Sequence, residues 1–220
     1  MKLILIGTKG IVCDIGHGVT SLVSMMIEQQ IPTSEIVEFG GYDLTQNVKK
    51  EYGILSYLHA QRIKEKYYMV PYERSDVLFA DQEPAEYALP DGKQIRIGKE
   101  RMIAPLHLLF DGGGYGGMNV SEMVANAIGA YEDKNVQRLL WQNIILSGGT
   151  SAMNGFAERF AKEIKFKTQA KTQIIAGGQR KYLSWIGGVV VSSISTFGKM
   201  TISKKEYEEK GDLRVLKEMM

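Results

Sequence analysis

Residues 10–20 read GIVCDIGHGVT. The apolar run up to Asp14 predicts a short buried strand, and Gly16 and Gly18 predict a tight turn after it. Two more strands are expected at 19–27 and 36–39. Glycines at such a turn let backbone N–H groups approach a phosphate, and an acidic residue at the strand end can hold a metal-bound water. Taken alone, however, this pattern more often marks a plain hairpin than a binding site.

A second stretch, IILSGGT at residues 144–150, predicts a buried strand followed by a glycine turn and a helix over 153–164. The free N–H groups at such a helix N-terminus are a natural site for an anion or a nucleotide. No Gly-Lys-Ser/Thr follows and a third glycine is missing, which excludes a Walker loop and a dinucleotide fingerprint. The alternative is a turn that needs glycine only for close packing.

Strand, glycine turn and helix occur a second time, with a strand at 172–176, Gly177-Gly178 and a helix over 182–195. This alternation predicts an α/β fold. Helices are also expected at 120–130 and 136–141. Just before these two helices, the glycine-rich residues 111–117 predict a mobile surface loop without regular structure.

The middle of the chain has a different pattern. A helix up to Tyr52, capped by Asp43 or Thr45, and a helix over 55–68 precede a hairpin at 87–97. Asp91-Gly92 between alternating apolar residues is the hairpin signal. We expect these elements to form a small subdomain inserted into the larger α/β unit.

Composition narrows the class of protein. The chain has 220 residues, 44% hydrophobic, with a net charge of +2, which favours neither a nucleic-acid nor a membrane partner. Cys13 is the single cysteine, so an internal disulfide is excluded. No apolar run approaches the roughly 20 residues of a membrane span. We expect a soluble cytoplasmic protein. The initiating Met1 favours a natural short protein, although a segment cut from a longer protein at a domain boundary would look the same.

Other candidate residues give weaker signals. His17, His59 and His107 are far apart, which leaves a zinc site or a catalytic triad unsupported. Lys181 could lie against an adenine ring or cover apolar surface with its stem.

In order and nearly in spacing, these segments together resemble actin and the actin-related proteins. The resemblance covers residues 10–211 and is carried by 10–20 as the second phosphate loop, by Gly40-Gly41 with DLT at 43–45, by IKEK at 63–66, by LPDGKQIRIGKER at 89–101, by LSGGT at 146–150 as the adenosine loop, by RKYLSWIGG at 180–188, and by STF at 195–197 with ISKKEYE at 202–208.

The resemblance implies the C-terminal half of an actin, meaning the two subdomains on one side of the nucleotide cleft. The fold implied is a ribonuclease-H-like actin-type ATPase domain over 1–42 and 105–220, with a small inserted α+β subdomain over 43–104. The cofactor implied is ATP or ADP with Mg²⁺, bound weakly or with the help of a partner. By motif match, Gly16, Gly18 and Val19 would face the phosphates, Asp14 would face the metal's water shell, and Gly41 would lie near the ribose and phosphates. The residues that would surround the adenosine are Lys64, Glu65, Gly148, Gly149, Thr150, Met153 and Lys181.

Departures from the family pattern bear on activity. The first phosphate loop, its lysine and the glutamine that positions the attacking water have no counterpart in these residues. His17 replaces an aspartate, Ser21 a histidine, Gln61 an arginine and Met153 a tyrosine, and the glycine-rich residues 111–117 replace a hydrophobic plug. Each missing catalytic group typically costs about 10²–10³-fold in rate. We therefore expect no catalytic residues and no ATPase activity from this chain alone.

The sequence raises three candidate functions. The leading one is an actin-like cytoskeletal binding, scaffold or regulatory module that works with actin, an actin-like protein or an actin-binding regulator. The alternative is a nucleotide-dependent filament-forming ATPase whose other half is supplied in trans. The third is a ribonuclease-H-like nuclease, which would need several clustered carboxylates to hold two metals. Asp14 is not accompanied by a matching cluster of carboxylates in the sequence.

Overall fold

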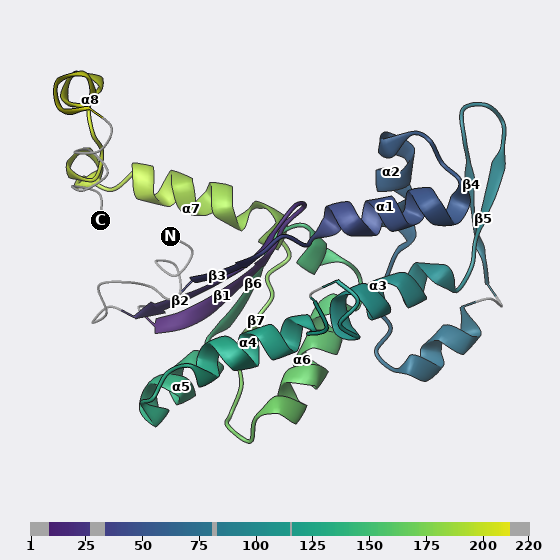
Figure 1. Ribbon diagram of the computed structural model, residues 1–220, viewed down its shortest axis with the longest axis horizontal. Helices are drawn as coiled ribbons and strands as arrows, with labels where there is room; N and C mark the ends of the chain where they lie inside the picture. The colour runs from purple at the N-terminus through teal and green to yellow at the C-terminus, as the bar shows by residue number, and fades with distance from the viewer. Residues whose placement is uncertain (1–8, 27–33, 81–82, 115, 212–220) are drawn as a thin grey trace.

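The computed structural model describes residues 9–26, 34–80, 83–114 and 116–211 (Figure 1). It consists of a five-stranded sheet with helices on both faces, a smaller group of elements at one end, and two C-terminal helices that project from the other end. This architecture confirms the mixed α/β class that the sequence predicts, whereas the ribonuclease-H-like plan with an inserted subdomain stays a prediction. Within the described ranges, every helix is too short or too polar to cross a membrane.

The central sheet combines antiparallel and parallel pairing. Its strands are β1 (Lys9–Ile15), β2 (Thr20–Met26), β3 (Ser34–Val37), β6 (Ile144–Ser147) and β7 (Ile174–Ile175), in the order β3-β2-β1-β6-β7. The pairs β1–β2 and β2–β3 are antiparallel, and β6 runs parallel to both β1 and β7. All five predicted strands are present, although β7 is only two residues long. Ile27, the expected end of the second strand, lies outside the described residues.

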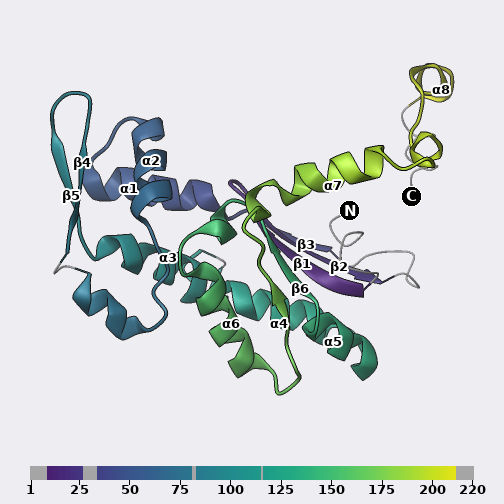
Figure 2. The same cartoon turned by 180° about the vertical axis from the view of Figure 1, so that it is seen from behind.

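Alternation along β1 explains why the strand is apolar throughout. Ile11, Cys13 and Ile15 belong to the main core, whereas Val12 packs with Ile145 on the opposite face. The core face is covered by α4 (Val120–Gly129), α5 (Lys134–Trp141) and α6 (Phe156–Lys167), and α7 (Leu183–Ser192) lies on the other side of the sheet (Figures 1 and 2). Beyond α7, the chain forms the short turn η5 (Phe197–Lys199) and α8 (Lys204–Lys210).

The smaller group of elements has its own hydrophobic cluster. It contains α1 (Gly41–Tyr52), α2 (Tyr57–Tyr67), the 3-10 helix η2 (Arg74–Phe79), the hairpin β4 (Ala85–Ala88) with β5 (Gln94–Ile97), and the start of α3 (Glu100–Phe110). Gly92 turns the hairpin with a φ of +85°, as the Asp-Gly signal predicted. The helix α3 runs from this cluster into the main core. The proposed boundaries at 43 and 104 stay a prediction.

Several predicted helix limits were wrong. The first helix begins at Gly41 rather than after Asp43 or Thr45, because Asp43 lies in its first turn and accepts the N–H of Gly40 at 2.9 Å. The helix expected from 153 begins at Phe156. The last long helix ends at Ser192 rather than 195. The helix α3 was not predicted.

The glycine-rich loop 111–117 forms no regular element, as predicted, but it packs closely on the core. The N–H groups of Gly113 and Gly114 donate to the carbonyls of His107 and Leu108, each at 3.1 Å. A Cβ on Gly114 would lie 2.2 Å from the ring of Phe39. Close approach is thus one reason for glycine here. Tyr115 lies outside the described residues, and the expected mobility stays a prediction.

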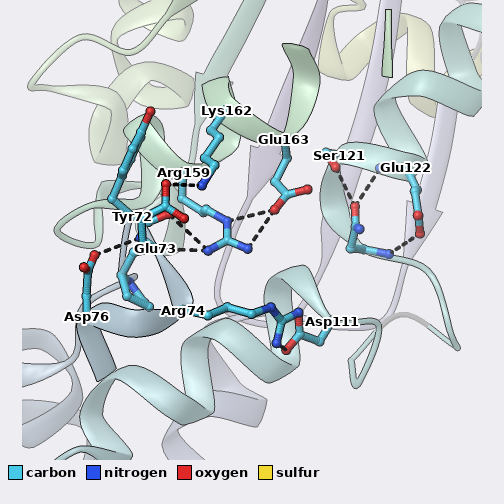
Figure 3. Close-up of polar contacts among 12 residues, drawn as sticks. Tyr72, Glu73, Arg74, Asp76, Asp111, Ser121, Glu122, Arg159, Lys162 and Glu163 are labelled. Atoms are coloured by element: carbon cyan, nitrogen blue, oxygen red, sulfur yellow. Dashed lines mark hydrogen bonds and ion pairs between the residues drawn. The ribbon is translucent and has the colours of Figure 1, made fainter. Parts of the chain in front are cut away.

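A polar network holds the connection that follows α2 against α6 (Figure 3). The buried Arg159 donates to Glu163 at 2.8 Å and to the carbonyl of Tyr72 at 3.2 Å. Nearby, Lys162 pairs with Glu73. A second tie joins Arg74 to Asp111, at the start of the glycine-rich loop. The Val70 N–H also donates to the carbonyl of Asn154 at 2.8 Å. The smaller group is thereby anchored beside the turn that follows β6.

Candidate functional site

A cavity of about 650 Å³ opens where four separate segments meet. The segments are the end of β1 with its turn, the helix α2, the turn after β6 with the 3-10 helix η3 (Thr150–Ala152), and the chain from η4 (Arg180–Tyr182) into α7. The lining residues are Asp14, Gly16, His17, Gln61, Lys64, Glu65, Gly148, Gly149, Thr150, Ala152, Met153, Lys181 and Ser184.

The turn after β1 is docked on the start of α1. Gly16 closes the turn by donating its N–H to the carbonyl of Val19 at 2.9 Å. Two N–H groups of α1 then reach the turn: Gly41 donates to the carbonyl of Gly16 at 3.0 Å, and Tyr42 to that of His17 at 2.6 Å. These bonds fix the backbone of the turn, while the side chains of His17 and Val19 stay exposed.

Gly41 lies beneath the cavity, where three segments are bonded together. Thr150 Oγ1 donates to the carbonyl of Gly16 at 2.7 Å, and Lys64 Nζ donates to the carbonyl of Gly41 at 2.7 Å. A Cβ on Gly41 would lie 2.6 Å from Thr150 Oγ1 and 3.1 Å from Lys64 Nζ. This close approach accounts for glycine at position 41, and it links α2 and η3 to the turn after β1.

Lys64 is an unusual cation because its side chain is buried, with 8% of the residue exposed. Burial lowers its pKa to about 8, an effect that Glu65 opposes and Lys181 adds to. Near neutral pH, Lys64 therefore presents a positive charge to the cavity at an energetic cost. An anionic ligand would offset that cost.

The turn after β6 is shaped by Gly148, which has a φ of +90°. A Cβ at this position would lie 2.2 Å from the carbonyl oxygen of Ile15 and 2.6 Å from Asp14 Oδ1. The Gly148 N–H donates to the carbonyl of Arg180 at 3.0 Å. Ser151 Oγ donates to the carbonyl of Gly148 at 2.8 Å. The backbone therefore passes directly beside Asp14, where no other residue type fits.

The expected helix N-terminus behind this turn is not there. The structure has the single 3-10 turn η3, in which Ala152 donates to the carbonyl of Gly149 and Met153 to that of Thr150. The following helix α6 begins at Phe156. An anion at this place would therefore meet the backbone of a tight turn and not the free N–H groups of a long helix.

The structure brings most predicted site residues together. Nine of the twelve line the cavity: Asp14, Gly16, Lys64, Glu65, Gly148, Gly149, Thr150, Met153 and Lys181. Gly41 lies beneath it, and Gly18 and Val19 lie on the exposed turn outside the lining. Sequence reasoning missed Ser184, whose Oγ lies 3.4 Å from Asp14 Oδ2. No local pattern signals that contact, because the two residues are 170 positions apart.

The cavity fits a magnesium nucleotide in its chemistry. Lys64 and Lys181 supply cations for an anion, Gly148 leaves room for close backbone approach, and Asp14 supplies a carboxylate. Among the residues that the structure describes, no three His, Cys, Asp or Glu side chains gather where they could hold a metal by themselves. Asp14 is the residue that would face the metal, which would take its other oxygens from water and phosphate.

A model of the family described as Actin matches residues 59–220, about three quarters of the chain. The chain therefore belongs to the actin family, whose members bind nucleotide with Mg²⁺. The matched region contains α2 from residue 59 on, the turn after β6 and Lys181, but it begins after the turn at residues 16–19. Any role of that turn in ligand binding is therefore supported by its position at the cavity and not by the family match.

Proposed function

We propose that the cavity is one wall of a cleft for ATP or ADP with Mg²⁺, and that the chain is an actin-like binding, scaffold or regulatory module of the cytoskeleton. The observation that carries this proposal is the convergence of four sequence segments on one cavity with two lysines and a glycine-lined turn. The partner proposed is actin, an actin-like protein or an actin-binding regulator, in the cytoplasm.

The domain plan proposed with it is ribonuclease-H-like, with residues 43–104 as an inserted subdomain. The separate hydrophobic cluster around Ile63 and Ile97 supports this plan. The strand order around β1, antiparallel on one side and parallel on the other, is compatible with it.

A partner is proposed because the cavity and its surroundings are open. A single wall buries less of a ligand than a closed cleft, so nucleotide binding by this wall alone is expected to be weak. The nearby segment from η4 into α7 exposes Tyr182 by 58%, Trp185 by 72% and Val189 by 46%, at a spacing that places them on one helix face, and contiguous exposed apolar patches mark interaction surfaces. A partner that covered this side would bury both the ligand and the helix.

The proposal is tested by calorimetric titration of Mg·ATP into the purified chain, alone and after addition of actin. Binding is expected to be weak alone and tighter with actin. A Lys64→Met variant should lose most of the affinity, whereas Lys66→Met should keep it, because Lys66 is exposed on the same helix and does not line the cavity. Absence of binding in both settings would refute the proposal.

A second candidate is a filament-forming ATPase with a facing wall supplied in trans. Asp14 favours it, because this carboxylate borders the cavity and could support a metal-bound nucleotide. Phosphate release measured before and after mixing with a polypeptide that carries a first phosphate loop distinguishes the two functions. Turnover that requires the mixture and disappears with Asp14→Ala would favour the second.

A further inference from the structure

His17, which lines the cavity, forms a cluster of three aromatic rings with Tyr42 and Tyr57. His17 Nε2 and Tyr57 Oη are 2.8 Å apart, within hydrogen-bond distance. The imidazole meets Tyr42 edge-on at 5.8 Å and Tyr57 edge-on at 6.1 Å, and the two tyrosine rings stack at 5.9 Å. The imidazole is therefore held on two sides, although His17 itself is exposed.

Of these three residues, only His17 lines the cavity. The carboxylates and lysines of the lining are balanced, with Asp14 and Glu65 against Lys64 and Lys181. An imidazole carries one N–H when neutral and two when protonated, so it can donate a hydrogen bond to a phosphate oxygen. A carboxylate in the same place could meet a phosphate only through a cation, because two negative groups repel each other.

We infer that His17, fixed by Tyr57 and Tyr42, is a phosphate-binding residue that lets this wall hold a nucleotide with little dependence on a divalent cation. The inference rests on the proposed nucleotide site and specifies its ligand: a nucleoside polyphosphate that is bound directly at this turn. Asp14 still favours a cation on its side of the cavity, so the dependence is reduced rather than abolished. Tyr57 is a positioning residue, since it acts through the imidazole.

The test is to titrate ATP into the full chain with Mg²⁺ and again with EDTA, following affinity and the ³¹P shifts of the nucleotide. For the natural chain, removal of Mg²⁺ should weaken binding by less than about threefold. For His17→Asp it should weaken binding by more than about tenfold, because the carboxylate repels the phosphates unless a cation lies between them. The asparagine of His17→Asn has the shape of aspartate but carries an N–H donor and no charge. This variant should therefore resemble the natural chain.

The chain contains a matched control in His59 and Tyr87. His59 Nδ1 lies 2.8 Å from Tyr87 Oη and the rings are 6.0 Å apart, so this pair resembles that of His17 and Tyr57 but lies outside the cavity lining. His59→Asp should leave the effect of Mg²⁺ unchanged. Tyr57→Phe should weaken Mg²⁺-free binding by about threefold through a looser imidazole, whereas Tyr87→Phe should not.

The outcomes separate the two proposals. If ATP binds but His17→Asp and His17→Asn depend on Mg²⁺ to the same extent, the role of His17 is refuted and the nucleotide site stands. If ATP causes neither heat nor ³¹P shifts in any variant, both are refuted. Thermal unfolding of each variant identifies loss of folding. If His17→Asp does not fold, Tyr57→Phe carries the comparison, and an unchanged Mg²⁺-free affinity in that variant would refute the role of His17.

Discussion

The two sides of the cavity differ in how far the chain itself completes them. On the side of α2 and η3, Lys64, Thr150 and Ser151 are buried and bonded to nearby backbone. On the side of the turn after β1, the side chains of His17 and Val19 are exposed. The side chains of the buried side are thus held by bonds within the chain. On the exposed side, bonds to α1 hold the backbone of the turn, while the side chains of His17 and Val19 face solvent. Substitutions on the two sides should therefore have different consequences.

The largest effect is expected at Gly148 on the buried side. Gly148→Ala places a Cβ 2.2 Å from the carbonyl oxygen of Ile15 at a φ of +90°, and should lower the free energy of unfolding by about 3 kcal/mol or more. The control is Gly149→Ala, whose Cβ would meet nothing closer than Lys181 Cγ at 3.7 Å. Urea unfolding of the two variants measures the difference, and equal stabilities would contradict the close packing of Gly148 against Ile15.

The next largest effect is expected at Arg159, which anchors the connection after α2 on the helix α6. Arg159→Met removes the bonds to Glu163 and Tyr72 and leaves polar groups of the connection without their partner (Figure 3). A loss of about 2 kcal/mol is expected, since Glu163 is still partly solvated. Lys162→Met breaks the more exposed pair with Glu73 and should cost less than about 1 kcal/mol. Chemical denaturation of both proteins gives the ranking, and the reverse order would contradict it.

A smaller effect is expected in the pH dependence of stability. Burial lowers the pKa of Lys64 to about 8, so between pH 8 and 10 the unfolded chain holds more protons than the folded one. The free energy of unfolding should then rise with pH, by at most about 1.4 kcal/mol per unit from this group. Lys64→Met should remove that rise, as measured by urea unfolding at several pH values. Parallel curves for the two proteins would contradict a lowered pKa of Lys64 in the folded protein.

The pH range must end near 10 because two tyrosines act in the opposite direction. Burial raises the pKa of Tyr52, aided by its hydrogen bond to Glu100, and burial also raises that of Tyr68. Above pH 10 these tyrosines keep protons in the folded protein that they lose in the unfolded chain. Their contribution to the free energy of unfolding therefore falls as the pH rises.

The smallest effect is expected on the exposed side. Gly18 has a φ outside the left-handed region, and a Cβ there would meet no atom within 4 Å. Gly18→Ala should therefore change the free energy of unfolding by less than about 0.5 kcal/mol. A loss of more than 1.5 kcal/mol in thermal or urea unfolding would mean that the turn is as tightly packed as the one after β6.

Much of the fold could be predicted because its signals are local. The apolar run before Asp14, the Asp91-Gly92 turn and the strand before Ser147 each indicate an element within a few residues. The helix α3 was missed because Pro105 interrupts its pattern, and most of its buried residues belong to a core assembled from distant segments. The start of α6 was misplaced because Gly149 and Thr150 form a tight turn first.

The cavity could be predicted only in part, because it is assembled from residues that are far apart in the sequence. Glycine turns and lysines show in the sequence as candidates, and the family motifs identify which of them belong together. The contacts of Ser184 with Asp14 and of Tyr57 with His17 join residues that are 170 and 40 positions apart. Such pairs depend on the tertiary arrangement. Ser184 lies in the motif RKYLSWIGG, but nothing in that motif indicates its contact with Asp14.

The most direct measurement of the central claim is hydrogen exchange of the chain with and without Mg·ATP. The nucleotide should slow exchange of the backbone in residues 148–153 and at the turn 14–19, and leave the hairpin of β4 and β5 unchanged. Slowing in the first two segments is the result that a wall of a nucleotide cleft predicts. Unchanged exchange there at a saturating nucleotide concentration, or protection only in the hairpin, would contradict it.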